Sequence, residues 1–166
     1  MEHLQDHRQF PRIKRPRAAE LIKQLGQFDG SGAQFFVNLL AVQCFLGQAD
    51  SGAILANNEQ KGVDVLAIYP ALRGQQTAPE WLNQSAELMR EATSTDAVIV
   101  KGLPAVPEPR LGRLDAEEND NRAARSYVVL VPLKMADIGQ AMEAFVVRTN
   151  DRDALEASKE QLELTE

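Results

Sequence analysis

The sequence predicts an α+β domain in which helices pack against a β-sheet. One observation is the order of the expected elements: two helices, a β-hairpin, a helix, a strand, a long loop, two strands and a final helix. Runs of strands mixed with helices, without strict alternation, are typical of this class. The other observation is residues 125–151, which contain two long strands around which the remaining elements are expected to assemble.

Residues 127–131 are an unbroken β-branched and apolar run, which is typical of a strand covered on both faces. Pro132 has no N–H to donate, so we expect it at an edge, a bulge or a bend. Residues 134–140 are expected to form the connection. Residues 141–149 then alternate, with Met142 and Phe145 on opposite faces of a second strand.

The composition is that of one globular domain. The chain has 166 residues and a net charge of −6, which argues against nucleic acid as a partner. With one cysteine, Cys44, it can form no internal disulfide and no multi-cysteine metal site. The first 20 residues contain no apolar core region and the apolar runs are too short to cross a membrane, so we expect a cytoplasmic protein without a signal peptide or a membrane span.

Two domain-level features are expected. Residues 1–17 carry five Lys/Arg and two Asp/Glu and read as a flexible basic N-terminal tail before a single domain over residues 18–166. Residues 104–125 contain three prolines and no sustained apolar pattern, and are expected to form a mobile loop.

The first two helices are expected over residues 18–29 and 33–46. Residues 30–32 (Gly-Ser-Gly) separate them, and either Asp29 or Ser31 can cap the second helix. That helix is apolar almost all round, and Gly47 is placed to follow its end as a C′ residue. Cys44 lies within it and is expected to be a small buried hydrophobe rather than a nucleophile.

The middle of the chain reads as a hairpin, a helix and a strand. Residues 51–56 and 63–69 form the hairpin, and residues 97–103 the strand. Thr77 and Glu80 have the spacing of a capping box for a helix reaching about residue 93. The last helix, in residues 150–166, is expected to turn Leu155, Leu162 and also Leu164 inward, and its pattern is unbroken at the end of the chain, as expected if it continued toward another domain.

Motifs that specify chemistry are absent from the sequence. It contains no phosphate-binding GxxxxGK[ST] or GxGxxG, no HExxH, no CxxC and no GxSxG. Both histidines, His3 and His7, lie in the expected tail, so a histidine-based mechanism has no candidate in the core. We therefore expect a protein that is not an enzyme and has no metal or cofactor.

Three stretches resemble the GAF domain family: QFFVNLLAVQCFLGQADSGAILA, VDVLAIYP and VVLVPLKMADIGQAMEAFVVRTND. The resemblance covers residues 18–166. It implies a central antiparallel sheet in a profilin-like three-layer sandwich, with the terminal helices on one side and the ligand-facing elements on the other. It also implies a regulatory or sensory module of a larger bacterial signalling or transport-associated protein.

The sequence departs from the ligand-binding patterns of that family. It lacks the Asn-Lys-Phe-Asp-Glu constellation of cyclic-nucleotide binders and the Cys–His pair of bilin binders. Its single cysteine does not suit the methionine sulfoxide reductases of this fold. Two interpretations stay open: a module that binds an unknown small molecule, or a structural dimerisation module with a filled core. A homodimer through the terminal helices is expected in both.

If a small molecule binds, five residues are candidates to line its pocket. Such a pocket would lie under the helix expected over residues 77–93. The candidates are Tyr69, Trp81, Met89, Lys101 and Tyr127.

Overall fold

The computed structural model describes residues 18–58, 60–74, 77–92, 97–104, 124–135 and 139–165. The expected tail, residues 1–17, and residues 105–123 of the expected loop lie outside them. In chain order the elements are α1 (Ala18–Gly26), α2 (Gly32–Leu46), β1 (Ser51–Asn58), β2 (Gly62–Tyr69), α3 (Glu80–Glu91), β3 (Ile99–Gly102), β4 (Arg125–Met135), β5 (Gly139–Thr149) and α4 (Arg152–Leu164).

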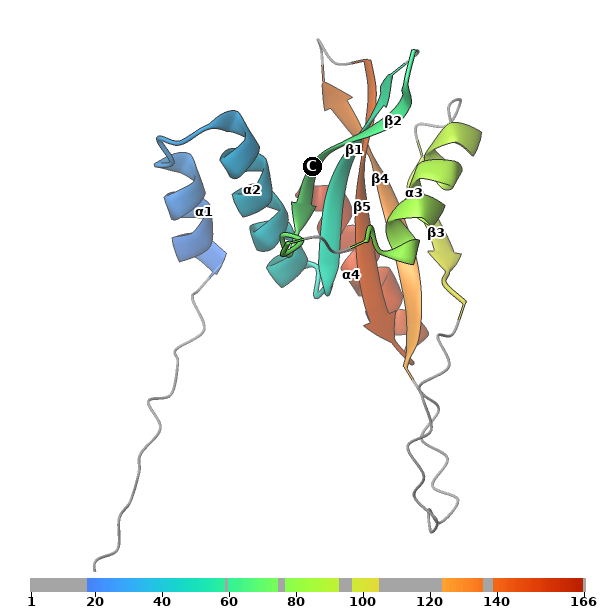
Figure 1. The fold of residues 1–166 in the computed structure, drawn as a ribbon. Helices are drawn as coiled ribbons and strands as arrows, with labels where there is room; N and C mark the ends of the chain where they lie inside the picture. The colour runs from blue at the N-terminus through green and yellow to red at the C-terminus, as the bar shows by residue number, and fades with distance from the viewer. Residues whose placement is uncertain are drawn as a thin grey trace, which may run out of the picture.

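The five strands form one antiparallel sheet in the order β2-β1-β5-β4-β3. Strand β5 occupies the middle, as Figure 1 shows, and pairs with β1 on one side and β4 on the other. The prediction that residues 125–151 contain the central strand pair is confirmed. Both strands are longer than expected, because residues 134–135 and 139–140 of the expected connection join the ladder.

Pro132 lies inside β4, opposite Met142 of β5. Strand β3 pairs with β4 only from Tyr127 to Leu130. Pro132 is therefore beyond the end of β3, where that side of β4 has no neighbour among the described strands. A residue without an N–H is tolerated at such an edge, in agreement with the expectation.

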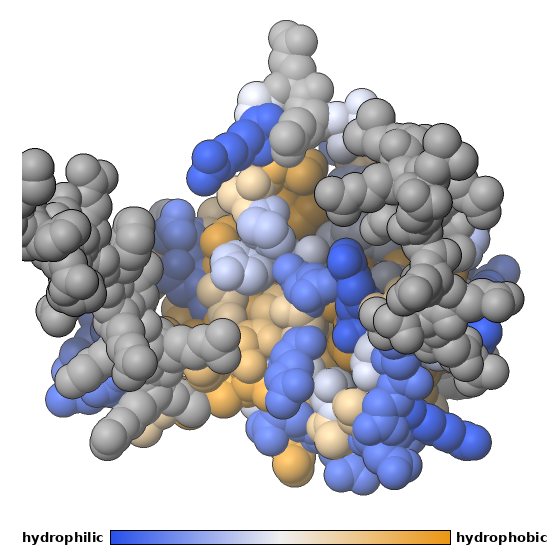
Figure 2. Space-filling view, turned by 90° about the horizontal axis from the view of Figure 1, so that it is seen from below, coloured by the Kyte–Doolittle hydropathy of each residue, from blue (hydrophilic) through white to orange (hydrophobic). Residues whose placement is uncertain are grey.

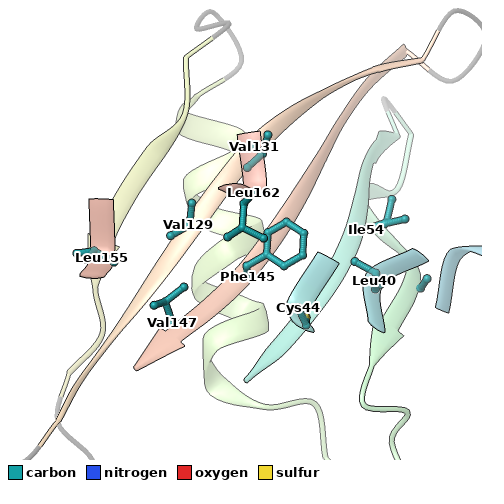
Figure 3. Packing of buried hydrophobic residues seen from close by; sticks show 10 residues of the cluster. Leu40, Cys44, Ile54, Val129, Val131, Phe145, Val147, Leu155 and Leu162 are labelled. Atoms are coloured by element: carbon teal, nitrogen blue, oxygen red, sulfur yellow. The ribbon is translucent and has the colours of Figure 1, made fainter. Parts of the chain in front are cut away.

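Helices cover both faces of the sheet and make three layers. One core cluster joins α2 and α4 to the sheet, with Phe145 and Leu162 both fully buried in it (Figure 3). The second cluster joins α3 to the opposite face through Met89, which is also fully buried. Alternation along β5 explains the division, because Phe145 and its neighbour Ala144 point to different layers. The α+β three-layer prediction is confirmed.

Helix α1 packs against α2 rather than on the sheet. In Figure 1 it lies on the outer side of α2, away from the strands. Leu21 and Leu25 are half-buried, while Ile22 is 55% exposed. The helix ends at Gly26, three residues before the expected end. Its apolar stripe is thus covered by its own chain in part.

The caps of α2 resolve one expectation and correct another. Ser31 is the N-cap, and its side chain accepts a hydrogen bond from the N–H of Gln34. Gly47 was expected as the C′ residue, but it is the C-cap, with a φ of −82°. The left-handed position is Gln48, with a φ of 52°. Glycine is needed at position 47 for another reason: an added Cβ would lie 2.5 Å from the Leu162 side chain.

Two expectations for the later helices are wrong. Helix α3 begins at Glu80 with Pro79 as its N-cap, and no side chain caps it, so Thr77 and Glu80 form no capping box. In α4, Leu155 and Leu162 are buried as expected, but Leu164 is 81% exposed. Leu164 is the last residue of α4. It lies beyond the edge of the core and does not belong to the inward-facing stripe of the helix.

Candidate functional site

Helix α3 covers the sheet face on which a ligand was expected. It contacts β1, β5 and β4. Its inward residues are buried, and they are apolar apart from Ser85. The Ser85 hydroxyl donates to the Trp81 carbonyl oxygen at 2.7 Å, so this polar group is satisfied within the helix. The contact between α3 and the sheet is therefore mainly hydrophobic.

Three of the five candidate pocket residues lie on the α3 side of the sheet. Met89 is fully buried, and Trp81 packs at the margin of the same cluster. Lys101 is exposed on β3, opposite Val128 in the register, which places it on the same face. Trp81 therefore lies at the margin of a buried apolar cluster, and Lys101 lies on the same face of the sheet without being part of that cluster.

The other two candidates lie on the opposite side. Tyr69 and Tyr127 both pack, partly buried, against the cluster formed with α2 and α4. The five residues therefore do not form one group: Trp81, Met89 and Lys101 share a face, and the two tyrosines are separated from them by the sheet. A role for any of the five in binding stays a prediction.

A buried polar pair joins α2 to the central strand, and sequence reasoning missed it. Glu143 on β5 is fully buried, and Gln43 on α2 is 1% exposed. Gln43 Nε2 donates to Glu143 Oε2 at 2.9 Å and to the carbonyl oxygen of Thr165 at 3.2 Å. One amide thus links β5, α2 and the turn that ends α4. Gln43 Oε1 is buried and accepts no hydrogen bond in the described part of the chain.

The signal for this pair was present in the sequence but incomplete. Glu143 interrupts the apolar alternation of residues 141–149, at a position on the same face as Phe145. Gln43 interrupts a helix that is otherwise apolar on nearly every side. Each residue could have been singled out, but their contact spans 100 residues of sequence and depends on how α2 lies on the sheet.

Cys44, next to Gln43, is buried as expected and 2% exposed. Burial raises the pKa of the Cys44 thiol to about 12, and negative charge at Glu143 and Asp50 contributes in the same direction. A thiol with this pKa is protonated at neutral pH and is a poor nucleophile. Cys44 fills space beside Phe145. A Cβ added at Gly52 would come close to both side chains.

The helical side leaves several large apolar side chains at the surface. Ile22 of α1 is 55% exposed, Phe45 of α2 is 42% exposed and Leu164 of α4 is 81% exposed. Figure 2, which views the molecule from below, also shows apolar surface framed by hydrophilic residues. Exposed apolar residues become informative when they gather on neighbouring elements, and α2 contacts both α1 and α4.

No group of three or more His, Cys, Asp or Glu side chains among the described residues could hold a metal ion. None of the helices formed by those residues is long and apolar enough to cross a membrane.

No protein-family model matches the sequence, and no curated protein does. Solved structures of similar fold include the GAF domain of A. aeolicus nlh2 in an inactive state, with a TM-score of 0.54, 13% identity and coverage of 89% of this chain and 86% of that chain. A GAF domain from Pseudomonas syringae pv. tomato covers 89% of this chain and 79% of its own, with 17% identity and a TM-score of 0.40. The match to the GAF domain of the cyanobacteriochrome TePixJ covers 86% of this chain and 90% of that chain, with 16% identity and a TM-score of 0.39.

At these identities the likeness concerns the fold. It extends over nearly the whole chain in the first of these structures, which agrees with the strand order, the three layers and the terminal helices described above. The chain has the fold of a GAF domain.

Proposed function

We propose that this chain is a regulatory module that self-associates through its helical layer and takes a small molecule beside α3. The observation that carries the proposal of self-association is the exposure of large apolar side chains on three helices of one layer. Ile22 of α1, Phe45 of α2 and Leu164 of α4 are all exposed, whereas the inward side of α3 makes a buried apolar contact with the sheet. A surface of this kind is suited to a partner helix.

Self-association is supported by the outer position of α1. It has an apolar stripe of which Ile22 is the most exposed member, and its main contact is with α2. A second copy that placed its α1 and α2 against this stripe would form a two-fold, self-complementary contact. Burying one isoleucine side chain contributes roughly 1.5–3 kcal/mol, so a few such residues on each copy would support a modest dimer.

Charge opposes the association. The outward side of α4 carries Glu156, Glu160 and Glu163, all exposed, and Lys159 pairs with one of them, Glu156, at 3.5 Å. In a two-fold contact near α4 these carboxylates would repel their symmetry copies. Salt screens such exposed charges over about 10 Å at 0.1 M, so the dimer should become stronger as salt is added.

The self-association test compares two substitutions of exposed apolar residues. Ile22→Gln keeps a residue with good helix propensity in α1 but removes its apolar side chain. Leu72→Gln does the same at a residue that is 40% exposed in the β2–α3 connection, outside the helical layer. Sedimentation velocity should show a dimer constant weakened about tenfold or more for Ile22→Gln, because 1.4 kcal/mol is a factor of ten, and unchanged for Leu72→Gln. A wild-type monomer at all protein and salt concentrations would contradict the proposal.

The ligand test uses the position of the single tryptophan. Trp81 lies at the margin of the α3 cluster, so a small molecule bound there should change its fluorescence. Mass spectrometry of the native protein first identifies small molecules that co-purify, and these are then titrated against Trp81 emission. For an anionic ligand, Lys101→Met should weaken binding and Lys61→Met, at an exposed turn, should not. Equal affinity in both variants would remove Lys101 from the site.

A second candidate function is a purely structural dimerisation module. It is favoured by the apolar filling between α3 and the sheet, with Met89 and Ser85 both at 0% exposure. This alternative predicts the same response to Ile22→Gln, no co-purifying small molecule and no ligand-dependent change in Trp81 emission. The two experiments together separate the candidates.

A further inference from the structure

The turn between α1 and α2 contains a dipeptide that is chemically labile when nothing restrains it. In Figure 1 this turn joins the upper ends of the two helices. It includes Asp29-Gly30, the only Asp-Gly in a sequence that has no Asn-Gly. Both residues are exposed and lie outside the helices, since α1 ends at Gly26 and α2 begins at Gly32. An aspartate carboxyl group can close a five-membered ring with the next backbone nitrogen, and glycine has no Cβ to hinder the approach.

Neither reacting group is held by other polar interactions. Asp29 was one of two expected caps of α2, but Ser31 is the N-cap, and its side chain accepts the hydrogen bond from the N–H of Gln34. Within the described part of the chain, neither the Asp29 carboxylate nor the Gly30 N–H forms a hydrogen bond or an ion pair. The carboxylate can therefore rotate toward the Gly30 nitrogen without losing such a contact. An intramolecular attack of this kind is much faster than its bimolecular equivalent.

Asp50 provides a contrast within the same molecule. It is also exposed, and it is also followed by a small residue, Ser51. The Asp50 N–H donates to the Val146 carbonyl oxygen at 2.8 Å, and Ser51 pairs with Val146 in the sheet. The Asp50 carboxylate forms an ion pair with Arg148 at 3.3 Å. Closing a ring at Asp50 would require these contacts to be broken, so the fold restrains Asp50 and leaves Asp29 unrestrained.

We propose that Asp29 is a site of spontaneous isomerisation in the folded protein, with the Gly30 nitrogen as the nucleophile. The nitrogen attacks Asp29 Cγ and forms a C–N bond. One carboxyl oxygen leaves as water, taking the proton released by the nitrogen and one more from the solvent, and a five-membered succinimide results. Water then opens the ring and returns that proton to the solvent. Opening at Cγ restores aspartate, whereas opening at the main-chain carbonyl gives isoaspartate, in which the chain continues through the side-chain carbon.

Isomerisation would act on the contact that joins α1 to α2. A Cβ added at Gly30 would overlap the Phe28 ring, so this ring lies directly against the Gly30 backbone. The Phe28 ring also pairs with that of Phe35 in α2, with the two centroids 6.4 Å apart. Isoaspartate adds one carbon to the main chain between these rings, and we expect it to displace Phe28 and loosen α1, because aromatic pairs depend on their geometry. As a control of self-association this rests on the proposed function, since α1 carries Ile22, but the reaction itself does not.

The first test measures the reaction. The intact protein is kept at mildly acidic pH and physiological temperature for several weeks, then digested and analysed by electron-transfer fragmentation, which distinguishes isoaspartate from aspartate. Isoaspartate should accumulate at residue 29 without a change in mass, through a form that is lighter by one water, and Asp50 should stay unchanged. Asp29→Glu is the matched control, because it keeps the negative charge but would need a six-membered ring, which closes much more slowly. Absence of isoaspartate at residue 29 in the aged wild type would overturn the proposal.

The second test asks whether the fold selects the site. Ageing in urea removes the sheet contacts of Asp50, so the amount of isoaspartate at residue 50 relative to that at residue 29 should rise on unfolding. Each residue is compared with itself in the folded and the unfolded protein, because Asp-Ser reacts more slowly than Asp-Gly even in short peptides. If unfolding leaves the ratio unchanged, the selection of Asp29 by the structure is refuted.

The link to α1 has its own readout. Lys23 is exposed on α1, and trypsin cleaves after it only when the helix opens locally. The isoaspartate form, separated by chromatography, should be cut at Lys23 several-fold faster than the unmodified protein, whereas Asp29→Glu aged in parallel should keep its initial rate. Equal rates would refute the loosening of α1. A wild type that stays monomeric would contradict the proposed self-association and leave the isoaspartate at residue 29 unaffected, so the two failures can be told apart.

Discussion

Replacing Gly47 with alanine tests how α2 is joined to α4. An added Cβ at this position would lie 2.5 Å from both Cγ and Cδ2 of Leu162 and 3.2 Å from the Gln43 carbonyl oxygen. Leu162 is fully buried and cannot move outward. The backbone is not the obstacle, because a φ of −82° is open to any residue. The forced displacement should lower the free energy of unfolding by about 1–3 kcal/mol.

The matched control is Gly32→Ala in the same helix, where an added Cβ would meet nothing within 4 Å. Alanine there should leave stability unchanged or raise it by up to about 1 kcal/mol, since it has the higher helix propensity. Urea unfolding followed by far-ultraviolet circular dichroism gives both values. For a chain of this length, each kcal/mol corresponds to about 2–4 °C in Tm.

A double-mutant cycle identifies the cause. Leu162→Ala alone should cost about 2–5 kcal/mol, because it leaves a cavity at a fully buried position. In that background the Cβ introduced by Gly47→Ala has room. The double mutant should therefore lose less stability than the sum of the losses of the two single mutants. If Gly47→Ala is as stable as wild type, or if the two changes are additive, the contact between α2 and α4 is not as described.

Two further predictions concern residues of α2. Leu40→Ala should cost about 2–5 kcal/mol and Leu39→Ala about 1–2 kcal/mol, because Leu40 is fully buried whereas Leu39 is half-buried; thermal melts should rank them in that order. The Cys44 thiol, with a pKa of about 12, should react with a thiol reagent at pH 8 only as fast as the protein opens, and rapidly in urea. Rapid labelling of the native protein would mean that α2 is not packed as the structure has it.

Element types and many of their bounds could be predicted from local patterns. The strand pair of residues 125–151, the hairpin and the cap at Ser31 follow from alternation, β-branched runs and side chains that bond to the nearby backbone. The start of α3 could not be predicted in this way, because the capping-box spacing of Thr77 and Glu80 competes with Pro79, which is the N-cap. Such choices differ by small energies that surrounding packing decides.

Local sequence patterns predict the α+β class, the central strands and the burial of Cys44, because periodicity and side-chain size act over a few neighbouring residues. Which residues share a face depends on the tertiary packing. It placed Tyr69 and Tyr127 on the side opposite Trp81 and Lys101. It also brought Gln43 onto Glu143, a contact across 100 residues that depends on the docking of α2 on the sheet. Local sequence patterns cannot predict a contact between residues so far apart in the chain, since strand register and helix docking are set by packing of the whole core.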